Sequence, residues 1–203
     1  MEQRAPGHAI LDDKIYHHGF LEFKRRIAES LARFEADPSP DAQKKRDQLR
    51  AMDIVCDAII LFARRHAELA RAMAEVETRP ERRQELLKIA GVCERVPAHA
   101  PRDFHEALQA YWFVHLGVIT ELNTWDSFNP GRLDQHLWPY YRDGLAEGSL
   151  TRDDAEELLQ CFWIKFNNQP APPKVGITEE QSGTYTDFAL INVGGVTPEG
   201  EDA

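Results

Sequence analysis

The chain has 203 residues, 42% of them hydrophobic and 29% charged, which is the composition of a folded domain with a sizeable core. Its 34 acidic and 24 basic side chains give a formal net charge of −10 at pH 7. Because nucleic acids and anionic membranes attract proteins with an excess of basic residues, this charge argues against both and leaves small molecules or other proteins as partners.

The cysteine pattern is typical of a reducing compartment, and the hydropathy pattern is typical of a protein without a membrane span. Cys56, Cys93 and Cys161 form no C-x-x-C pair, and scattered cysteines suit small buried thiols better than a disulfide framework. No apolar run approaches the roughly 20 residues that a membrane span needs. The first residues, Met-Glu-Gln-Arg, do not resemble a signal peptide. The sequence therefore predicts a cytoplasmic protein without a membrane segment.

Apolar residues at helical spacing predict helices over the first half of the chain. One helix starts near Gly19 and stops before the Pro-Ser-Pro at 38–40, and a long one covers about 41–77. Thr78 as N-cap, with a proline and an acid behind it, predicts a third helix over about 79–93. The long helix carries one apolar stripe that we expect to face the core: Leu49, Met52, Val55, Ile59, Phe62, His66, Leu69 and Met73.

Four more elements are predicted in the second half. Asp103 and Glu106 open a helix whose run 107–122 is apolar on nearly every side and should be deeply buried, around a core histidine at 115. Helices over 133–147 and from Thr151 to about 166 follow. A strand is predicted at 187–193, after a long loop rich in proline and glycine.

The loop at 123–132 combines large aromatic and small polar side chains. Surface connections between helices are usually small and polar, so this mixture indicates either a walled pocket or a buried plug between helices. We expect its residues Trp125, Asp126 and Ser127 to line a cleft. We also expect Arg132, which follows the loop, to be buried in an ion pair with Asp134.

The segment that follows carries a family signature. Pro-Gly-Arg-Leu-Asp-Gln at 130–135, followed by Trp-Pro-Tyr-Tyr at 138–141, resembles the S-x-G-R-x-D-Q-x-x-x-P-Y-Y pattern of the glycyl radical enzymes of the pyruvate formate-lyase superfamily. Segments 105–109, 161–167, 192–196 and 200–203 are similar to the same family, in its order. The resemblance implies a mainly α-helical part of a ten-stranded α/β barrel. Residues 1–203 would then be a partial pyruvate formate-lyase domain.

The resemblance also implies how the chemistry is divided. In the family, a glycyl radical near the C-terminus takes hydrogen from a cysteine, and the resulting thiyl radical attacks the substrate. Neither motif occurs in these 203 residues, so we expect no catalytic residue here and expect both motifs beyond Ala203. The chain is expected to bind no cofactor. The parent's radical would be installed by an S-adenosylmethionine radical activating enzyme, and the full-length protein is expected to form a homodimer.

What carries over from the family is substrate binding. The loop string resembles isethionate sulfite-lyases, which release sulfite and acetaldehyde by carbon–sulfur cleavage. The candidate substrate-binding residues are Gln3, Arg4, His8, Trp125, Asp126 and Ser127. Diol, hydroxyproline or choline members and formate acetyltransferase-like enzymes remain alternatives, although Asp126 departs from the histidine that diol dehydratases have at that position. A non-catalytic helical interaction module is the alternative of a different class.

Two further expectations follow. No metal site is predicted, because His105-Glu106-x-x-Gln109 has glutamine where a zinc helix needs its second imidazole. If the chain is a segment of a larger enzyme, the helix 107–122 and the strand 187–193 should leave an apolar patch uncovered. The isolated chain should then aggregate or oligomerise, and it should neither develop a glycyl radical nor release sulfite.

Overall fold

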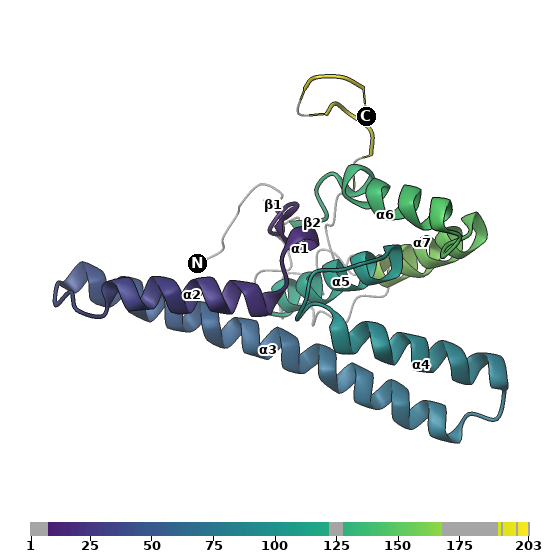
Figure 1. The fold of residues 1–203 in the computed structure, drawn as a ribbon, viewed down its shortest axis with the longest axis horizontal. Helices are drawn as coiled ribbons and strands as arrows, with labels where there is room; N and C mark the ends of the chain where they lie inside the picture. Colours follow the sequence, from purple (N-terminus) through teal and green to yellow (C-terminus); the bar gives the residue numbers. More distant parts are fainter. Residues whose placement is uncertain (1–7, 122–127, 168–190, 192, 198, 203) are drawn as a thin grey trace, which may run out of the picture. The chain divides into compact units, whose positions relative to one another are not determined.

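The structure, a computed structural model, describes residues 8–121, 128–167, 191, 193–197 and 199–202 (Figure 1). The chain divides into two compact units. One contains Ile15–Pro101, and the other contains Met1–Lys14 together with Arg102–Ala203. Among the described residues, no helix is both long enough and apolar enough to cross a membrane.

The first unit is a bundle of three helices. A single-turn helix, α1 (Lys14–His17), leads into α2 (Phe20–Phe34), which is followed by α3 (Pro40–Val76) and α4 (Pro80–Arg95). Figure 1 shows α2 lying along the first half of α3 and α4 along its second half. The three predicted helices are confirmed, each to within about two residues of its expected bounds.

The starts of these helices have different local causes. Ser39 caps α3 as an N-cap residue should, because its hydroxyl accepts a hydrogen bond from the Ala42 amide at 3.2 Å. The prediction that Thr78 is the N-cap of α4 is wrong. Arg79 occupies the N-cap position, and the Glu77 carboxylate accepts a hydrogen bond from its amide at 3.0 Å.

The packing face of α3 is made of small residues, so the predicted core stripe is wrong. The buried side chains of α3 are Ala42, Cys56, Ala63, Ala67, Ala70 and Ala74. In the predicted stripe, Leu49 and Ile59 are partly exposed, and the other six residues, His66 among them, are exposed. A row of alanines lets α2 and α4 approach the α3 backbone closely, and side chains of leucine size would prevent that approach.

Close backbone contact also fixes the start of α2. The amides of Phe20 and Leu21 donate hydrogen bonds to the carbonyls of Pro97 and Ala98 at 2.8 and 3.0 Å. A Cβ at Gly19 would lie 2.3 Å from the Ala98 oxygen, which is a severe clash. Glycine is therefore required at this position for its lack of a side chain.

Ion pairs join the helices at the surface of the bundle. The Lys24 ammonium lies 2.7 Å from Asp53 and 2.8 Å from Asp57, which ties α2 to α3. Arg71 of α3 pairs with Glu94 of α4. Solvent reaches all of these side chains, so each pair stabilises the bundle only modestly.

The second unit is built on α5 (Phe104–Glu121), which packs against α6 (Leu133–Glu147) and α7 (Arg152–Asn167). As predicted, Asp103 caps α5 by accepting a hydrogen bond from the Glu106 amide at 2.8 Å. The side chain of Glu106 is 2% exposed, and Arg102 neutralises its carboxylate. Helix α6 ends at Gly148, whose φ of 71° is left-handed.

The core of this unit is aromatic. Tyr111, Trp112 and His115 of α5 pack against Phe162 and Phe166 of α7, with ring centroids 4.9 to 6.5 Å apart. Twelve residues of α5 are buried, so the expectation that this helix leaves an apolar patch uncovered is wrong. Large exposed apolar side chains occur instead on α3.

The strands differ from the prediction. Two short parallel strands, β1 (His8–Ala9) and β2 (Phe128–Asn129), form a pair that the sequence did not indicate. The predicted strand at 187–193 lies outside the described residues except for Ile191 and Val193, and neither of these is in a strand. The described residues are therefore mainly helical, as expected.

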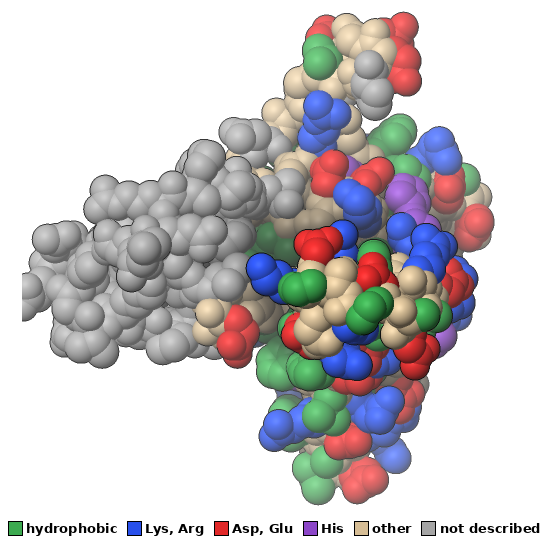
Figure 2. Space-filling view, turned by 90° about the vertical axis from the view of Figure 1, so that its left-hand side faces the viewer, with side chains coloured by type: hydrophobic (Ala, Val, Ile, Leu, Met, Phe, Trp, Pro, Cys, Tyr) green, Lys and Arg blue, Asp and Glu red, His purple; other side chains and the backbone are tan. Residues whose placement is uncertain are grey.

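On the face shown in Figure 2, acidic and basic side chains are interspersed over the described helices. The net negative charge of the chain is thus not gathered into one acidic region on this face. Mixed charge of this kind is typical of a solvated surface.

We predict that Ala67→Leu lowers the free energy of unfolding by about 1–3 kcal/mol, because the added carbons would have to enter a tight helix contact. Ala67 is 1% exposed, whereas Leu69, two positions away on the same helix, is 59% exposed. The matched control Leu69→Ala should change stability by no more than about 0.5 kcal/mol. Urea unfolding of the chain checks both, and a larger loss for Leu69→Ala than for Ala67→Leu would contradict the assignment of the packing face.

Candidate functional site

The pairing of β1 with β2 joins two distant parts of the sequence. His8 pairs with Phe128 and Ala9 with Asn129, in parallel, and the Ile10 amide donates to the Asn129 carbonyl at 3.3 Å. Ile10 itself is buried. The N-terminal segment and the end of the aromatic loop are therefore neighbours in space. Two-residue strands are too short for an alternating pattern, so nothing in the sequence could have revealed this pairing.

A tight turn leads from β2 into α6. The Asn129 side chain accepts a hydrogen bond from the Gly131 amide at 2.9 Å, Pro130 is buried, and Gly131 has a left-handed φ of 65°. The prediction that Arg132 is buried in an ion pair with Asp134 is wrong. Arg132 is exposed at the N-cap position of α6, and both oxygens of Asp134 accept hydrogen bonds from backbone amides.

Three consecutive side chains in the first turns of α6, Asp134, Gln135 and His136, each contact a remote segment. We call them the α6 junction. Asp134 accepts a hydrogen bond from the Gly194 amide, and the Gln135 amide group donates to the Val196 carbonyl at 3.4 Å. Nε2 of His136 lies 3.4 Å from Oδ1 of Asp12. The junction thus holds both the segment after β1 and the segment around Gly194.

The His136 ring is largely covered, with 12% of its side chain exposed, whereas Asp12 is 60% exposed. Burial lowers the pKa of His136, and the nearby carboxylates of Asp12 and Asp13 oppose that shift. Leu11 and Asp12 adopt left-handed φ angles of 58° and 49°, which turn the chain toward α6 directly after the strand.

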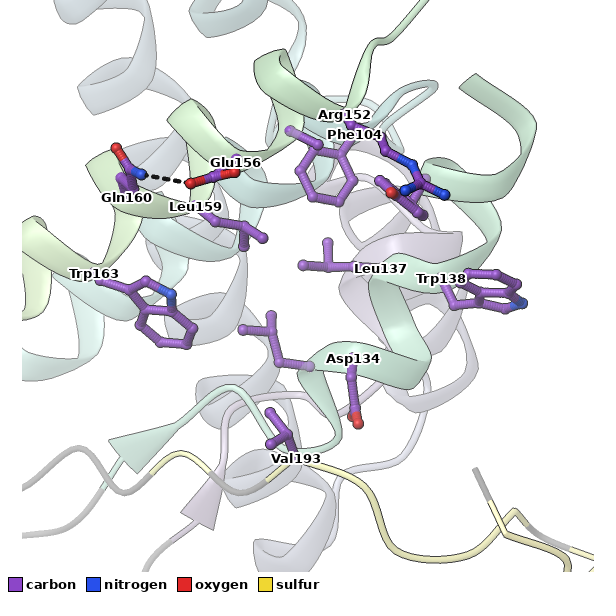
Figure 3. Close-up of a pocket in the computed structure, with 13 residues that line it drawn as sticks. Phe104, Asp134, Leu137, Trp138, Arg152, Glu156, Leu159, Gln160, Trp163 and Val193 are labelled. Atoms are coloured by element: carbon purple, nitrogen blue, oxygen red, sulfur yellow. Dashed lines mark hydrogen bonds between the residues drawn. The ribbon is translucent and has the colours of Figure 1, made fainter. Parts of the chain in front are cut away.

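A groove of about 620 Å³ lies between α6 and α7 (Figure 3). Its walls are mostly apolar, and its polar groups include Asp134 and a hydrogen-bonded pair in which Gln160 donates to Glu156 at 3.0 Å. The lining residues are Phe104, Leu133, Asp134, Leu137, Trp138, Tyr141, Arg152, Ala155, Glu156, Leu159, Gln160, Trp163 and Val193. None of them was a predicted site residue, because apolar helix faces give no functional signal in a sequence.

The sequence-predicted site residues fall mainly outside the described residues. Gln3, Arg4, Trp125, Asp126 and Ser127 all do. The backbone of His8 is described as the first residue of β1, but its side chain is not. The predicted cleft therefore stays a prediction, and what the structure adds is the pairing of the two strands that follow these segments.

Other titratable groups of the unit have structural roles. His115 is fully buried, with Nδ1 3.2 Å from the Tyr111 hydroxyl, which confirms the predicted core histidine. Burial, and then the charge of Glu106, raises the pKa of Tyr140 to about 12, so this phenol keeps its proton at neutral pH. In the described parts of the chain, no three histidine, cysteine or acidic side chains are grouped as metal ligands.

Comparison with known proteins identifies the family. The family model described as pyruvate formate lyase-like matches residues 1–203. Trans-4-hydroxy-L-proline dehydratase of Clostridioides difficile is 55% identical over 202 residues, 100% of this chain but 26% of the relative. Isethionate sulfite-lyase of Nitratidesulfovibrio vulgaris is 40% identical over 194 residues, 94% of this chain and 23% of the relative. The chain belongs to the pyruvate formate lyase-like family.

Solved structures agree with this assignment. The crystal structure of the hydroxyproline dehydratase from Clostridioides difficile, with trans-4-hydroxy-L-proline bound, matches with a TM-score of 0.90 over 100% of this chain and 26% of that chain, at 55% identity. The B12-independent glycerol dehydratase of Clostridium butyricum, with glycerol bound, matches with a TM-score of 0.86 at 32% identity, over 97% of this chain and 24% of that chain. The chain thus spans about a quarter of the length of these relatives.

The three cysteines should differ sharply in reactivity. Cys161 is exposed, whereas Cys56 and Cys93 are buried, and burial raises the pKa of the Cys93 thiol to about 11. Because the thiolate is the nucleophile, we predict that maleimide at pH 8 labels Cys161 at least about tenfold faster than the other two. Mass spectrometry of timed samples checks this. Cys161→Ser should remove the fast phase, and fast labelling that survives this change would contradict the burial of the other thiols.

Proposed function

We propose that this chain is a substrate-binding part of a glycyl radical dehydratase, and that the complete polypeptide dehydrates trans-4-hydroxy-L-proline. The observation that carries the proposal is the 55% identity over the whole chain to a protein of that activity, compared with 40% to isethionate sulfite-lyases. This substrate was an alternative in the sequence analysis, which favoured isethionate.

The strand pair supports the candidate binding residues. Gln3 and Arg4 precede β1 in the sequence, and residues 125–127 precede β2. Because the strands are parallel, the chain enters both from the same end of the pair. We therefore propose that these residues, with His8, face one shared substrate cavity, and that β1 and β2 belong to the α/β barrel of the complete enzyme.

The chemistry of the candidate residues fits a zwitterionic substrate. Trans-4-hydroxy-L-proline carries a carboxylate, a ring ammonium and a hydroxyl group. Arg4 is suited to the carboxylate, and Asp126 to the ammonium, through charge-assisted hydrogen bonds. Gln3, His8 and Ser127 offer groups that can bind the hydroxyl, and Trp125 offers an apolar wall for the ring.

Isethionate is the second candidate, favoured by the loop string at 123–132 and by the 40% identity to sulfite-lyases. It is an anion with a hydroxyl group and no cationic group. A carboxylate at position 126 would repel its sulfonate, whereas the same carboxylate would attract a ring ammonium. Asp126 thus favours the amino acid over the sulfonate.

The radical chemistry belongs to other parts of the complete polypeptide. We propose a glycyl radical installed by an S-adenosylmethionine radical activating enzyme, and a homodimer, as expected from the family resemblance. The glycyl radical starts the reaction. The residues of this chain bind and orient the substrate, which converts a random encounter into an aligned one.

We predict that the complete polypeptide, activated anaerobically, converts trans-4-hydroxy-L-proline into a pyrroline carboxylate and water. Mass spectrometry of the products checks the reaction, and electron paramagnetic resonance confirms that the radical has formed. Isethionate is assayed beside it for sulfite release. Sulfite formation from isethionate without turnover of hydroxyproline would replace the proposed substrate with the second candidate.

Two charge-removing variants test the binding residues. Asp126→Asn and Arg4→Gln should each raise KM for trans-4-hydroxy-L-proline by about tenfold or more, because each removes a charge-assisted contact worth about 1.5–3 kcal/mol. Asp153→Asn and Arg33→Gln change the same residue types at exposed helix positions and serve as matched controls. An unchanged KM in both test variants would exclude these residues from the site.

A further inference from the structure

Helix α3 has two apolar faces that point in different directions. The helices α2 and α4 pack against the first, which consists of small buried residues. The second face lies one residue earlier at each turn: Val55, Phe62, His66, Leu69 and Met73 directly precede the buried Cys56, Ala63, Ala67, Ala70 and Ala74. Successive residues of a helix are about 100° apart around its axis, so the second face points away from the first by about a right angle.

The second face has the spacing of a coiled-coil contact. Its residues follow one another at alternating steps of four and three positions: Gln48, Met52, Val55, Ile59, Phe62, His66, Leu69 and Met73. We call these eight residues the α3 seam. Ile59 is partly exposed and the other seven are exposed, Val55 and Leu69 by more than half. A strict alternation of this kind is the pattern by which one helix packs along another, so the partner that fits the seam is a second helix.

The middle of the seam carries two rings. The Phe62 and His66 rings meet edge to face with their centroids 4.5 Å apart, and Nδ1 of His66 lies 2.9 Å from the Phe62 carbonyl oxygen. The imidazole thus has a hydrogen-bonding group within its own helix. Aromatic side chains contribute strongly to contacts between proteins, so this ring pair marks the centre of the surface.

A second copy of α3 fits the seam when the two helices run antiparallel. In the register that places Ile59 against Phe62 of the other copy, each seam residue meets a seam residue: Val55 meets His66, Met52 meets Leu69, and Gln48 meets Met73. The seam is therefore complementary to itself, which is the condition for a contact between two identical chains across a two-fold axis.

The residues that flank the seam favour the same register. On the side away from the buried alanines, α3 presents the exposed residues Ala51, Ala58, Arg65 and Ala72. Three of the four are small, so another helix can approach closely. In the register above, Arg65 faces Ala58 of the other copy, whereas a shift of seven residues would place it against the other Arg65. Repulsion between two arginines disfavours the shifted register.

We infer that the α3 seam is an interface between two copies of the polypeptide, in which the two α3 helices pack antiparallel. The inference rests on the homodimer of the proposed function and names the surface through which that dimer forms. It does not depend on the substrate.

The first test places charges in the seam of the complete polypeptide, with Phe62→Glu and Leu69→Glu combined in one variant. A carboxylate at the centre of the contact would be buried without a partner, so we expect the dissociation constant of the dimer to rise about a hundredfold or more. Sedimentation at increasing protein concentration measures this constant.

The matched control combines Ile54→Glu with Leu61→Glu. These residues are also apolar and exposed on α3, but they lie outside the seam. The control should sediment as the unchanged dimer. All four substituted side chains are exposed, so both variants should unfold at the same urea concentration as the unchanged protein. A seam variant that stays dimeric would overturn the inference, as would a control that dissociates equally.

Disulfide formation tests the orientation. Met52→Cys and Leu69→Cys are made separately, each with Cys161→Ser because that thiol is exposed. The antiparallel register places residues 52 and 69 of different copies side by side, whereas the two copies of residue 52 lie about 25 Å apart along the helix axis. A disulfide that links 52 to 69 should therefore form only when the two variants are mixed, which mass spectrometry of the peptides detects. Links between identical positions in the separate samples would exclude the antiparallel packing.

The proposed function and the inference can fail separately. A dimer that survives the seam substitutions leaves the homodimer standing and overturns only the assignment of its surface. A monomeric complete polypeptide overturns both of these. Turnover of trans-4-hydroxy-L-proline is assayed independently and decides the substrate alone.

Discussion

In the second unit, a short parallel strand pair and the first turns of α6 join segments that lie far apart in the sequence. β1 comes from the first of the two stretches of sequence that form the unit and β2 from the second, and they share only two paired positions. Asp134, Gln135 and His136 supply the additional contacts, to Gly194, Val196 and Asp12. The helix core is held by aromatic packing, whereas these polar contacts join α6 to the segment after β1 and to the segment around Gly194. This explains why the signature at 130–135 contains charged and amide side chains at positions where a simple helix start would need only a cap.

The helical unit follows a different rule. In α3, the size of a side chain decides which face packs, because α2 and α4 approach across alanines while leucine, methionine and valine face outward. Large apolar side chains of α3, such as Val55, Leu69 and Met73, are therefore exposed. Gly19 shows the same preference for close backbone contact, since its amide neighbours bond directly to the 97–98 carbonyls.

Much of this could be predicted from the sequence, and the limits have physical causes. Helix starts were predictable where a strong local signal acts within a few residues, as at Asp103 and Thr151. The packing face of α3 could not be predicted. Hydrophobic periodicity shows where apolar side chains gather along a helix, but it does not show which of them are small enough for close contact between helices. The strand pair and the hydrogen bond between Asp134 and Gly194 could not be predicted either, because both join residues more than 50 positions apart. The family signature was recognisable, but the role of each residue in it required coordinates.

The two units differ in how far apart their contacts lie along the chain, which has a consequence for biosynthesis. The bundle of α2, α3 and α4 uses neighbouring helices joined by short turns, so it can form as soon as residue 101 has left the ribosome. β1 is made before the described helices α1 to α7, yet its partner strand begins 120 positions later, at Phe128. During synthesis β1 therefore stays unpaired while the bundle of α2, α3 and α4, which follows it in the sequence, folds. β1 thus remains unpaired for longer than the helices of the bundle, which leaves it accessible to chaperones and proteases during that time.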